Sequence, residues 1–173
     1  KFNALLLWFI NTLTKIMCFF AWRSLNLVVD NHSIARADSS RLKVATMTPH
    51  GLAKPAPALI YYHGGGFAIT YATLHLHNCA RYANEAGCIV VFVDYRLMPR
   101  HPFPGGFDDC YAALEWVVRQ ADSLGIDANR IAVGGDSAGG ALAAGVAQKA
   151  RDKQLVSLCA QFLIYPVLDN SCS

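Results

Sequence analysis

The sequence predicts an α/β domain whose sheet is mostly parallel and carries helices on both faces. Short, continuous apolar runs at 58–62, 88–95 and 130–135 alternate with segments of helical periodicity at 74–86 and 107–121. Continuous apolar runs are typical of strands covered on both faces. Strands that alternate with helices are joined by crossovers, which make neighbouring strands parallel. With 173 residues, 54% of them hydrophobic and only 16% charged, the chain can form one packed domain.

The boundaries of these elements follow from glycine and proline. Apolar residues between Phe107 and Ala121 recur at three- and four-residue steps, which predicts a helix that begins after Pro104 and ends at Gly125. Gly87 ends the helix at 74–86 in the same way. The remaining predicted elements are a polar linker (28–41), a half-exposed strand (42–48), a turn (50–57), a helix (137–153) and a fourth buried strand (158–166).

The N-terminal residues 4–22 are nearly all apolar and approach the length of a membrane span. Asn11 and Lys15 interrupt the run, and a lysine deep inside a span is energetically costly. A helix that packs over an apolar pocket has the same composition. The sequence therefore favours a helix packed on the domain, with a membrane anchor as the alternative.

Charge and cysteine content exclude several classes of function. The formal net charge is only +3, and no Lys/Arg cluster is interleaved with aromatic residues, so we expect no nucleic-acid partner. The six cysteines are scattered without a C-x-x-C pair, which argues against a zinc site and predicts no metal. Free thiols indicate a reducing compartment, so we expect a cytoplasmic protein, although the even count leaves an oxidised, secreted alternative open.

A single serine stands among small residues in Gly135-Asp136-Ser137-Ala138-Gly139, between a predicted strand and a predicted helix. In this context G-x-S-x-G predicts a sharp, strained turn that exposes the hydroxyl, with glycines giving clearance on both sides. The N–H of Ala138 begins the helix and points where negative charge would develop. A plain serine N-cap is the alternative, but it does not explain the two glycines.

A second glycine-rich string, His63-Gly64-Gly65-Gly66-Phe67, follows the first buried strand. Successive glycines allow a loop to turn backbone N–H groups toward the oxyanion of an acyl-transfer intermediate. Nucleotide binding is the weaker interpretation, because neither a complete G-x-G-x-x-G nor a Gly-Lys-Ser/Thr ending is present. A structural turn alone would not predict a serine elbow further along the chain.

Four motifs in order, "HGGGF", "DYRLMPRHPFP", "GDSAGG" and "YPVLD", resemble the hormone-sensitive lipase-like branch of the α/β-hydrolases over residues 42–169. The resemblance implies a serine esterase without cofactor, acting through an acyl-enzyme on short or medium acyl esters or aryl esters. It implies that Ser137 is the nucleophile. It implies further that Gly64, Gly65 and Ala138 donate the oxyanion hydrogen bonds. The motif also contains supporting residues: His63, Gly66, Gly135, Asp136 and Gly139.

The resemblance also suggests a division of the chain. Residues 1–41 would form an N-terminal helical cap segment, and residues 42–173 the N-terminal part of the catalytic domain. Arylacetamide deacetylase, an animal relative, carries an N-terminal anchor, which keeps the anchor alternative open for residues 4–22. The chain departs from the usual motif at Met98 and Arg100, where the family has alanine and an acidic residue. The reversed charge of Arg100 puts a salt bridge at that corner in doubt.

The sequence after Ser137 offers no histidine as the base of a catalytic triad and no clear carboxylate as its acid. The α/β-hydrolase order is serine, acid, histidine, yet all six histidines precede Ser137. Downstream, we interpret Asp152 as a solvated helix residue and Asp169 as structural, whereas Asp136 faces away from the serine in a structural or tuning role. His63 already has a role in the glycine loop, which disfavours it as the base.

We therefore expect the acid and the histidine to lie beyond the given chain, so that the fold is incomplete at its C-terminus and the 173-residue piece is inactive. The alternative function is a receptor-like small-molecule binder or an inactive relative on the same fold. The sequence gives no indication of oligomeric state or of the substrate beyond a small-molecule ester.

Overall fold

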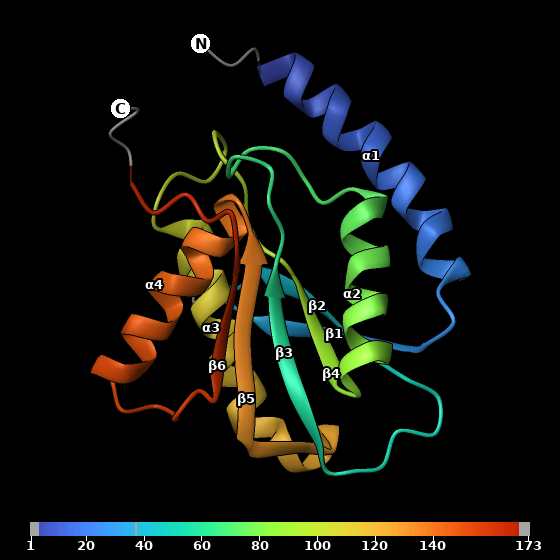
Figure 1. Ribbon diagram of the computed structural model, residues 1–173. Helices are drawn as coiled ribbons and strands as arrows, with labels where there is room; N and C mark the ends of the chain where they lie inside the picture. The colour runs from blue at the N-terminus through green and yellow to red at the C-terminus, as the bar shows by residue number, and fades with distance from the viewer. Residues whose placement is uncertain (1–3, 37, 170–173) are drawn as a thin grey trace.

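The computed structural model of the protein describes residues 4–36 and 38–169, and a six-stranded sheet forms its centre (Figure 1). The helices are α1 (Ala4–Ser24), α2 (Thr73–Ala86), α3 (Gly105–Leu124) and α4 (Ala138–Asp152). The strands are β1 (Val28–Ala35), β2 (Arg41–Thr48), β3 (Ala56–Tyr62), β4 (Ile89–Asp94), β5 (Ile126–Asp136) and β6 (Ala160–Ile164).

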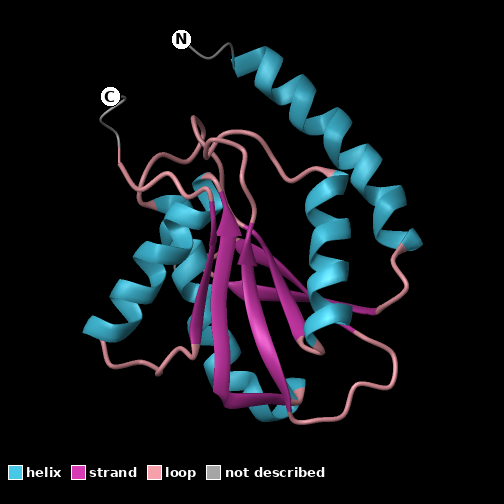
Figure 2. Cartoon of the chain, viewed as in Figure 1, coloured by secondary structure: helices cyan, strands magenta, loops and turns pink. Residues whose placement is uncertain are grey.

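The sheet has the strand order β1-β2-β4-β3-β5-β6. Strands β3 to β6 pair in parallel, whereas β1 and β2 form an antiparallel hairpin whose second strand pairs antiparallel with β4. Helices α1 and α2 lie on one side of the sheet and α3 and α4 on the other (Figure 2). The predicted α/β-hydrolase architecture, a mostly parallel sheet covered on both faces, is confirmed.

The strand register brings the two glycine-rich strings to the same edge of the sheet. Tyr62, the last residue of β3, is paired with Gly135, and Asp136 at the end of β5 is paired with Ile164 of β6. Because parallel strands end on the same side, the loop after β3 and the turn after β5 emerge next to each other.

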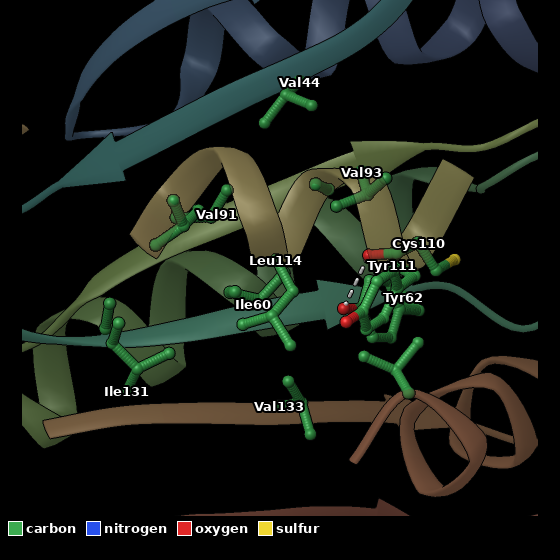
Figure 3. Close-up of a cluster of buried hydrophobic side chains, with 14 of the residues drawn as sticks. Val44, Ile60, Tyr62, Val91, Val93, Cys110, Tyr111, Leu114, Ile131 and Val133 are labelled. Atoms are coloured by element: carbon green, nitrogen blue, oxygen red, sulfur yellow. Dashed lines mark hydrogen bonds between the residues drawn. The ribbon is translucent and has the colours of Figure 1, made fainter. Parts of the chain in front are cut away.

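Successive side chains of β3 point to opposite faces of the sheet and pack into the two hydrophobic cores there. Ile60 and Tyr62 point to the core under α3 and α4, where Leu114 of α3 packs and the Tyr62 hydroxyl donates to the Cys110 carbonyl oxygen at 3.1 Å (Figure 3). Leu59 and Tyr61 point to the other core, under α2. This period of two explains why β3 is apolar along its whole length.

One element differs from the sequence-based expectation. The predicted polar linker at 28–41 is wrong, because Val28–Ala35 forms strand β1 and pairs with β2 along its whole length. β1 is an edge strand in which only Ile34 is buried, so it lacks the apolar run that indicates a strand. A boundary between residues 41 and 42 therefore cuts through a β-hairpin that belongs to the sheet.

Candidate active site

Ser137 adopts the strained turn that its surroundings predict. Its backbone angles are φ 52° and ψ −118°, a conformation that non-glycine residues rarely adopt. Its N–H donates to the Ile164 carbonyl oxygen at 2.9 Å, and its carbonyl oxygen accepts from the Val167 N–H at 3.2 Å. The half-exposed side chain makes no capping hydrogen bond, so the interpretation of Ser137 as a plain N-cap is wrong.

The flanking glycines are required by close packing. A Cβ on Gly139 would lie 2.6 Å from the His63 carbonyl oxygen and would overlap that of Tyr62. A Cβ on Gly135 would lie 2.6 Å from the carbonyl carbon of Gly139. All of these are backbone atoms, which cannot give way as a flexible side chain could. The first turn of α4 therefore packs directly on the end of β3.

The triple-glycine loop is attached to the serine turn through Asp136. The Gly64 N–H donates to Asp136 Oδ1 at 3.0 Å, and the Tyr61 hydroxyl donates to the same oxygen at 2.6 Å. The Gly64 N–H, one of the expected oxyanion donors, is therefore bonded to Asp136 in this structure, and its oxyanion role stays a prediction. The N–H groups of Gly65 and Gly66 have no hydrogen-bond acceptor among residues 4–36 and 38–169.

Asp136 is held by a histidine of α2. His75 Nδ1 accepts the N–H of Ala72 at 2.8 Å, which leaves Nε2–H to donate to Asp136 Oδ2 at 3.3 Å. Burial by itself would raise the pKa of Asp136, but the hydrogen bonds from His75 and Tyr61 outweigh it and lower the pKa to about 2. Asp136 is therefore ionised at neutral pH and bonds to the glycine loop, in keeping with the structural role expected for it.

His63 packs inside the domain. Its Nδ1–H donates to the Gly64 carbonyl oxygen at 2.6 Å, and its ring stacks on Tyr95 with centroids 4.4 Å apart. The Tyr95 hydroxyl donates to the His63 carbonyl oxygen at 2.6 Å. Complete burial lowers the pKa of His63 to about 3, so its ring is neutral at physiological pH.

No base for Ser137 is present among the described residues. The six histidines all lie between residues 32 and 101, and none of them makes a hydrogen bond with Ser137. Asp152 is exposed and pairs with Arg151 at 2.8 Å, as expected for a solvated helix residue. Within residues 4–36 and 38–169, no group of His, Cys, Asp and Glu side chains could hold a metal ion.

A cluster of ion pairs around Asp109, which the sequence did not indicate, holds the segment that follows β4. Asp109 is buried on α3 and accepts two bonds from the Arg36 guanidinium, at 2.7 and 2.9 Å. Arg96 also reaches Asp109, at 2.9 Å. Arg100, whose reversed charge put a salt bridge here in doubt, is exposed, and Arg96 makes the ion pairs instead. Arg36 lay in the segment interpreted as a linker, so the sequence offered no signal for this pairing.

An apolar cavity of about 270 Å³ lies beside the glycine loop. It is lined by Phe67, the residue after the three glycines, and by Leu142, five residues after Ser137 on α4. Tyr95, Met98 and Phe107 complete most of its apolar wall. The cavity can hold a small apolar group near the loop that presents the free N–H groups.

Several known proteins with related sequences are named as esterases or ester hydrolases. The chain is 47% identical over 111 residues to esterase LipI of Mycobacterium tuberculosis, which covers 64% of this chain and 35% of the relative. It is 47% identical over 116 residues to ethyl acetate hydrolase of Pseudomonas putida, which covers 66% of this chain and 36% of the relative. The match thus spans about a third of the length of these relatives.

Solved structures give the same result. Esterase LipW from Mycobacterium marinum superposes on 100% of this chain with a TM-score of 0.89 and 34% identity, and the match covers 56% of that structure. A bacterial heroin esterase matches 93% of this chain with a TM-score of 0.83 and 41% identity, over 52% of its own length. The family model described as the α/β-hydrolase fold matches residues 59–173. The chain therefore belongs to the α/β-hydrolase family, in the hormone-sensitive lipase-like carboxylesterase branch that its four motifs resemble.

Proposed function

We propose that the protein is a serine hydrolase that cleaves small carboxylic esters through an acyl-enzyme. The observation that carries this proposal is the conformation of Ser137, a half-exposed residue on a strained turn. It lies beside a glycine loop in which the Gly65 and Gly66 N–H groups have no acceptor among the described residues. The names of the relatives, esterase, carboxylesterase and ethyl acetate hydrolase, support the same reaction class. They do not favour the receptor-like alternative.

In this proposal Ser137 Oγ attacks the acyl carbon, and negative charge develops on the carbonyl oxygen. The Ala138 N–H stabilises that charge from the N-terminus of α4, where the first N–H groups have no partner within the helix. The Gly65 and Gly66 N–H groups are the donors from the loop, because Gly64 is bonded to Asp136. The apolar cavity lined by Phe67 and Leu142 would receive a short acyl or aryl group.

Ser137 also needs a base, and an acid to orient that base. None of the six histidines bonds to it, and the relatives are much longer than the matched region. We therefore propose that the histidine and the acid are supplied by residues beyond Ser173. Water would then attack the acyl-enzyme with the same histidine as base and release the carboxylic acid.

The test is hydrolysis of p-nitrophenyl esters by the full-length protein and its Ser137→Ala variant. We expect kcat to fall at least about 10³-fold, because removal of the nucleophile leaves only oxyanion and binding contributions. A fluorophosphonate probe should label the wild type and not the variant. Ser123→Ala, an exposed serine of α3 that bonds only to Gln120, is the matched control.

The 173-residue chain by itself should show no turnover above background, because it lacks a base for Ser137. Hydrolysis by this piece that disappears in Ser137→Ala would contradict the proposed origin of the base. Full-length activity that survives Ser137→Ala would overturn the proposed function itself.

We also propose a cytoplasmic location. The five described cysteines, Cys18, Cys79, Cys88, Cys110 and Cys159, are free thiols, as expected in a reducing compartment. The sixth, Cys172, lies outside the described residues.

A further inference from the structure

His75 lies in the first turn of α2, and its imidazole ring makes two hydrogen bonds at once. Its Nδ1 accepts the N–H of Ala72 at 2.8 Å, and its Nε2 lies 3.3 Å from Asp136 Oδ2. Because Nδ1 is an acceptor, the ring proton is on Nε2, which donates to the carboxylate. The start of α2 therefore fixes both the orientation of the ring and the nitrogen that faces Asp136.

Both carboxylate oxygens of Asp136 are hydrogen-bonded. Oδ1 accepts from the Gly64 N–H at 3.0 Å and from the Tyr61 hydroxyl at 2.6 Å, while Oδ2 accepts from His75. The two oxygens belong to one planar group and turn together about the Cβ–Cγ bond. The bond from His75 to Oδ2 therefore helps to set where Oδ1 lies, and with it the position of the Gly64 N–H.

The triple-glycine loop packs directly on this carboxylate. A Cβ on Gly64 would overlap Asp136 Oδ2 and would lie 3.1 Å from the Asp136 carbonyl oxygen. After Gly64 the loop closes on itself, because the Gly65 carbonyl oxygen accepts the N–H groups of Ala68 and Ile69 at 3.1 and 2.8 Å. A turn closed by its own hydrogen bonds moves as a unit. A shift of the carboxylate would thus carry the loop with it.

We propose that His75 is a positioning residue for the oxyanion hole, acting through the Asp136 carboxylate on the triple-glycine loop. Asp136 directly precedes Ser137, so one carboxylate joins the nucleophile to the loop whose Gly65 and Gly66 N–H groups are the proposed donors. This role rests on the proposed ester hydrolysis. Oxyanion stabilisation depends on donors that are already in place, and a misplacement of about 1 Å can lower the rate about 100-fold.

The alternative is that His75 serves only the start of α2, through the bond from Ala72 to Nδ1. The two ring nitrogens allow these roles to be separated. Asparagine at position 75 would place its amide oxygen near the site of Nδ1 but would be too short to reach Asp136. Glutamine, one bond longer, would place its amide N–H near the site of Nε2 and lose the acceptor for Ala72.

The test compares His75→Asn and His75→Gln in the full-length protein, with p-nitrophenyl butyrate as substrate. His75→Asn should lower kcat about tenfold or more and change KM less than about twofold, because the loop donors act in the transition state. His75→Gln should keep kcat within about threefold of the wild type. Binding of phenyl trifluoromethyl ketone, whose adduct with Ser137 carries an oxyanion, should weaken in His75→Asn in parallel with kcat.

His77→Asn is the matched control, since it makes the same change at an exposed position of α2 and should keep the kcat of the wild type. Equal activities of His75→Asn and His75→Gln, whether high or low, would overturn the proposal, as would a less active His75→Gln. A rise in KM at unchanged kcat in His75→Asn would also overturn it. Should His75→Asn not fold, His75→Gln decides: the kcat of the wild type supports the positioning role, and its loss contradicts it.

Failure of the positioning role is distinguishable from failure of the proposed function. Full-length activity that survives Ser137→Ala would remove both. Hydrolysis that is lost in Ser137→Ala but retained in full by His75→Asn would leave the esterase in place and remove only the role of His75.

Discussion

The serine turn after β5 and the helix α1 both contact the triple-glycine loop and its continuation, but they are held in different ways. Asp136 in the serine turn is buried and bonds to Gly64, and the adjoining Gly139 packs against backbone atoms of β3. α1 reaches the loop through Asn11, while most of its large apolar side chains are exposed.

The difference shows which part of the site is rigid. The serine turn is fixed by close contacts between backbone atoms and by buried hydrogen bonds. These contacts hold the strained φ of Ser137 in place. α1 packs Cys18, Ala21 and Trp22 against the core under α2, and its contacts near the loop are a few side-chain bonds that can be removed singly. Three changes would break or sharpen this comparison, starting with the largest expected effect.

Gly139→Ala should destabilise the fold by at least about 4 kcal/mol, because the new methyl group would collide with backbone carbonyl oxygens of Tyr62 and His63. Chemical denaturation, or loss of soluble protein, would measure the effect. Gly145→Ala on the same helix is the control: its Cβ would meet only the Phe107 ring, at 3.0 Å, and the change should stay within about 1 kcal/mol. Equal effects at both positions would show that the serine turn is not unusually constrained.

Acid should lower the free energy of unfolding through His63, which lies in the glycine loop beside the serine turn. The pKa of His63 is lowered from 6.5 to about 3 by burial, so the unfolded chain takes up the proton first as the pH falls. Stability should therefore decline from about pH 6.5 downward, by about 3 kcal/mol at pH 4, in denaturant titrations. The depressed pKa of Asp136, about 2, extends the decline below about pH 4.

The control for this pH dependence is His50, an exposed histidine in the turn before β3. His50→Gln should keep the decline, whereas His63→Gln should flatten it between pH 6.5 and 4. A His63→Gln protein with the slope of the wild type would show that another group causes the loss.

The smallest effect is expected at α1. Asn11→Ala removes the two hydrogen bonds to Ala68 and Thr70 and should cost about 1–2 kcal/mol. Hydrogen exchange should show faster opening of α1 and of the Thr70 amide, while amides of β5 remain protected. Thr12→Ala, which loses only a local bond to Trp8 on the exposed side, should change little. Faster exchange in β5 of the Asn11 variant would mean that the two regions are coupled.

Much of the fold was predictable because the signals were local. The apolar runs of β3 and β4 and the helical period of α3 each occur within one element, and Gly87 and Gly125 end their helices in left-handed conformations at φ 59° and 70°. β1 was missed because an edge strand buries only Ile34 and leaves no apolar run.

In the site, the sequence indicated Ser137 and its glycines, since their spacing is a property of a single turn. The family resemblance implied an oxyanion role for the Gly64 N–H, which stays a prediction. The bond of this N–H to Asp136 had no signal in the sequence, because the acceptor is 72 residues away. His75 and Tyr61, which hold Asp136, gave no signal for the same reason.

By itself the sequence determined the α/β class, the serine turn and the presence of an apolar N-terminal helix. Hydrophobic periodicity, glycine placement and composition are properties of short stretches of sequence and do not depend on distant segments. Only the tertiary structure decided which N–H groups of the loop stay free, which histidine touches Asp136, and which face of α1 is turned outward. Those properties depend on hydrogen-bond partners that come together only when distant segments pack.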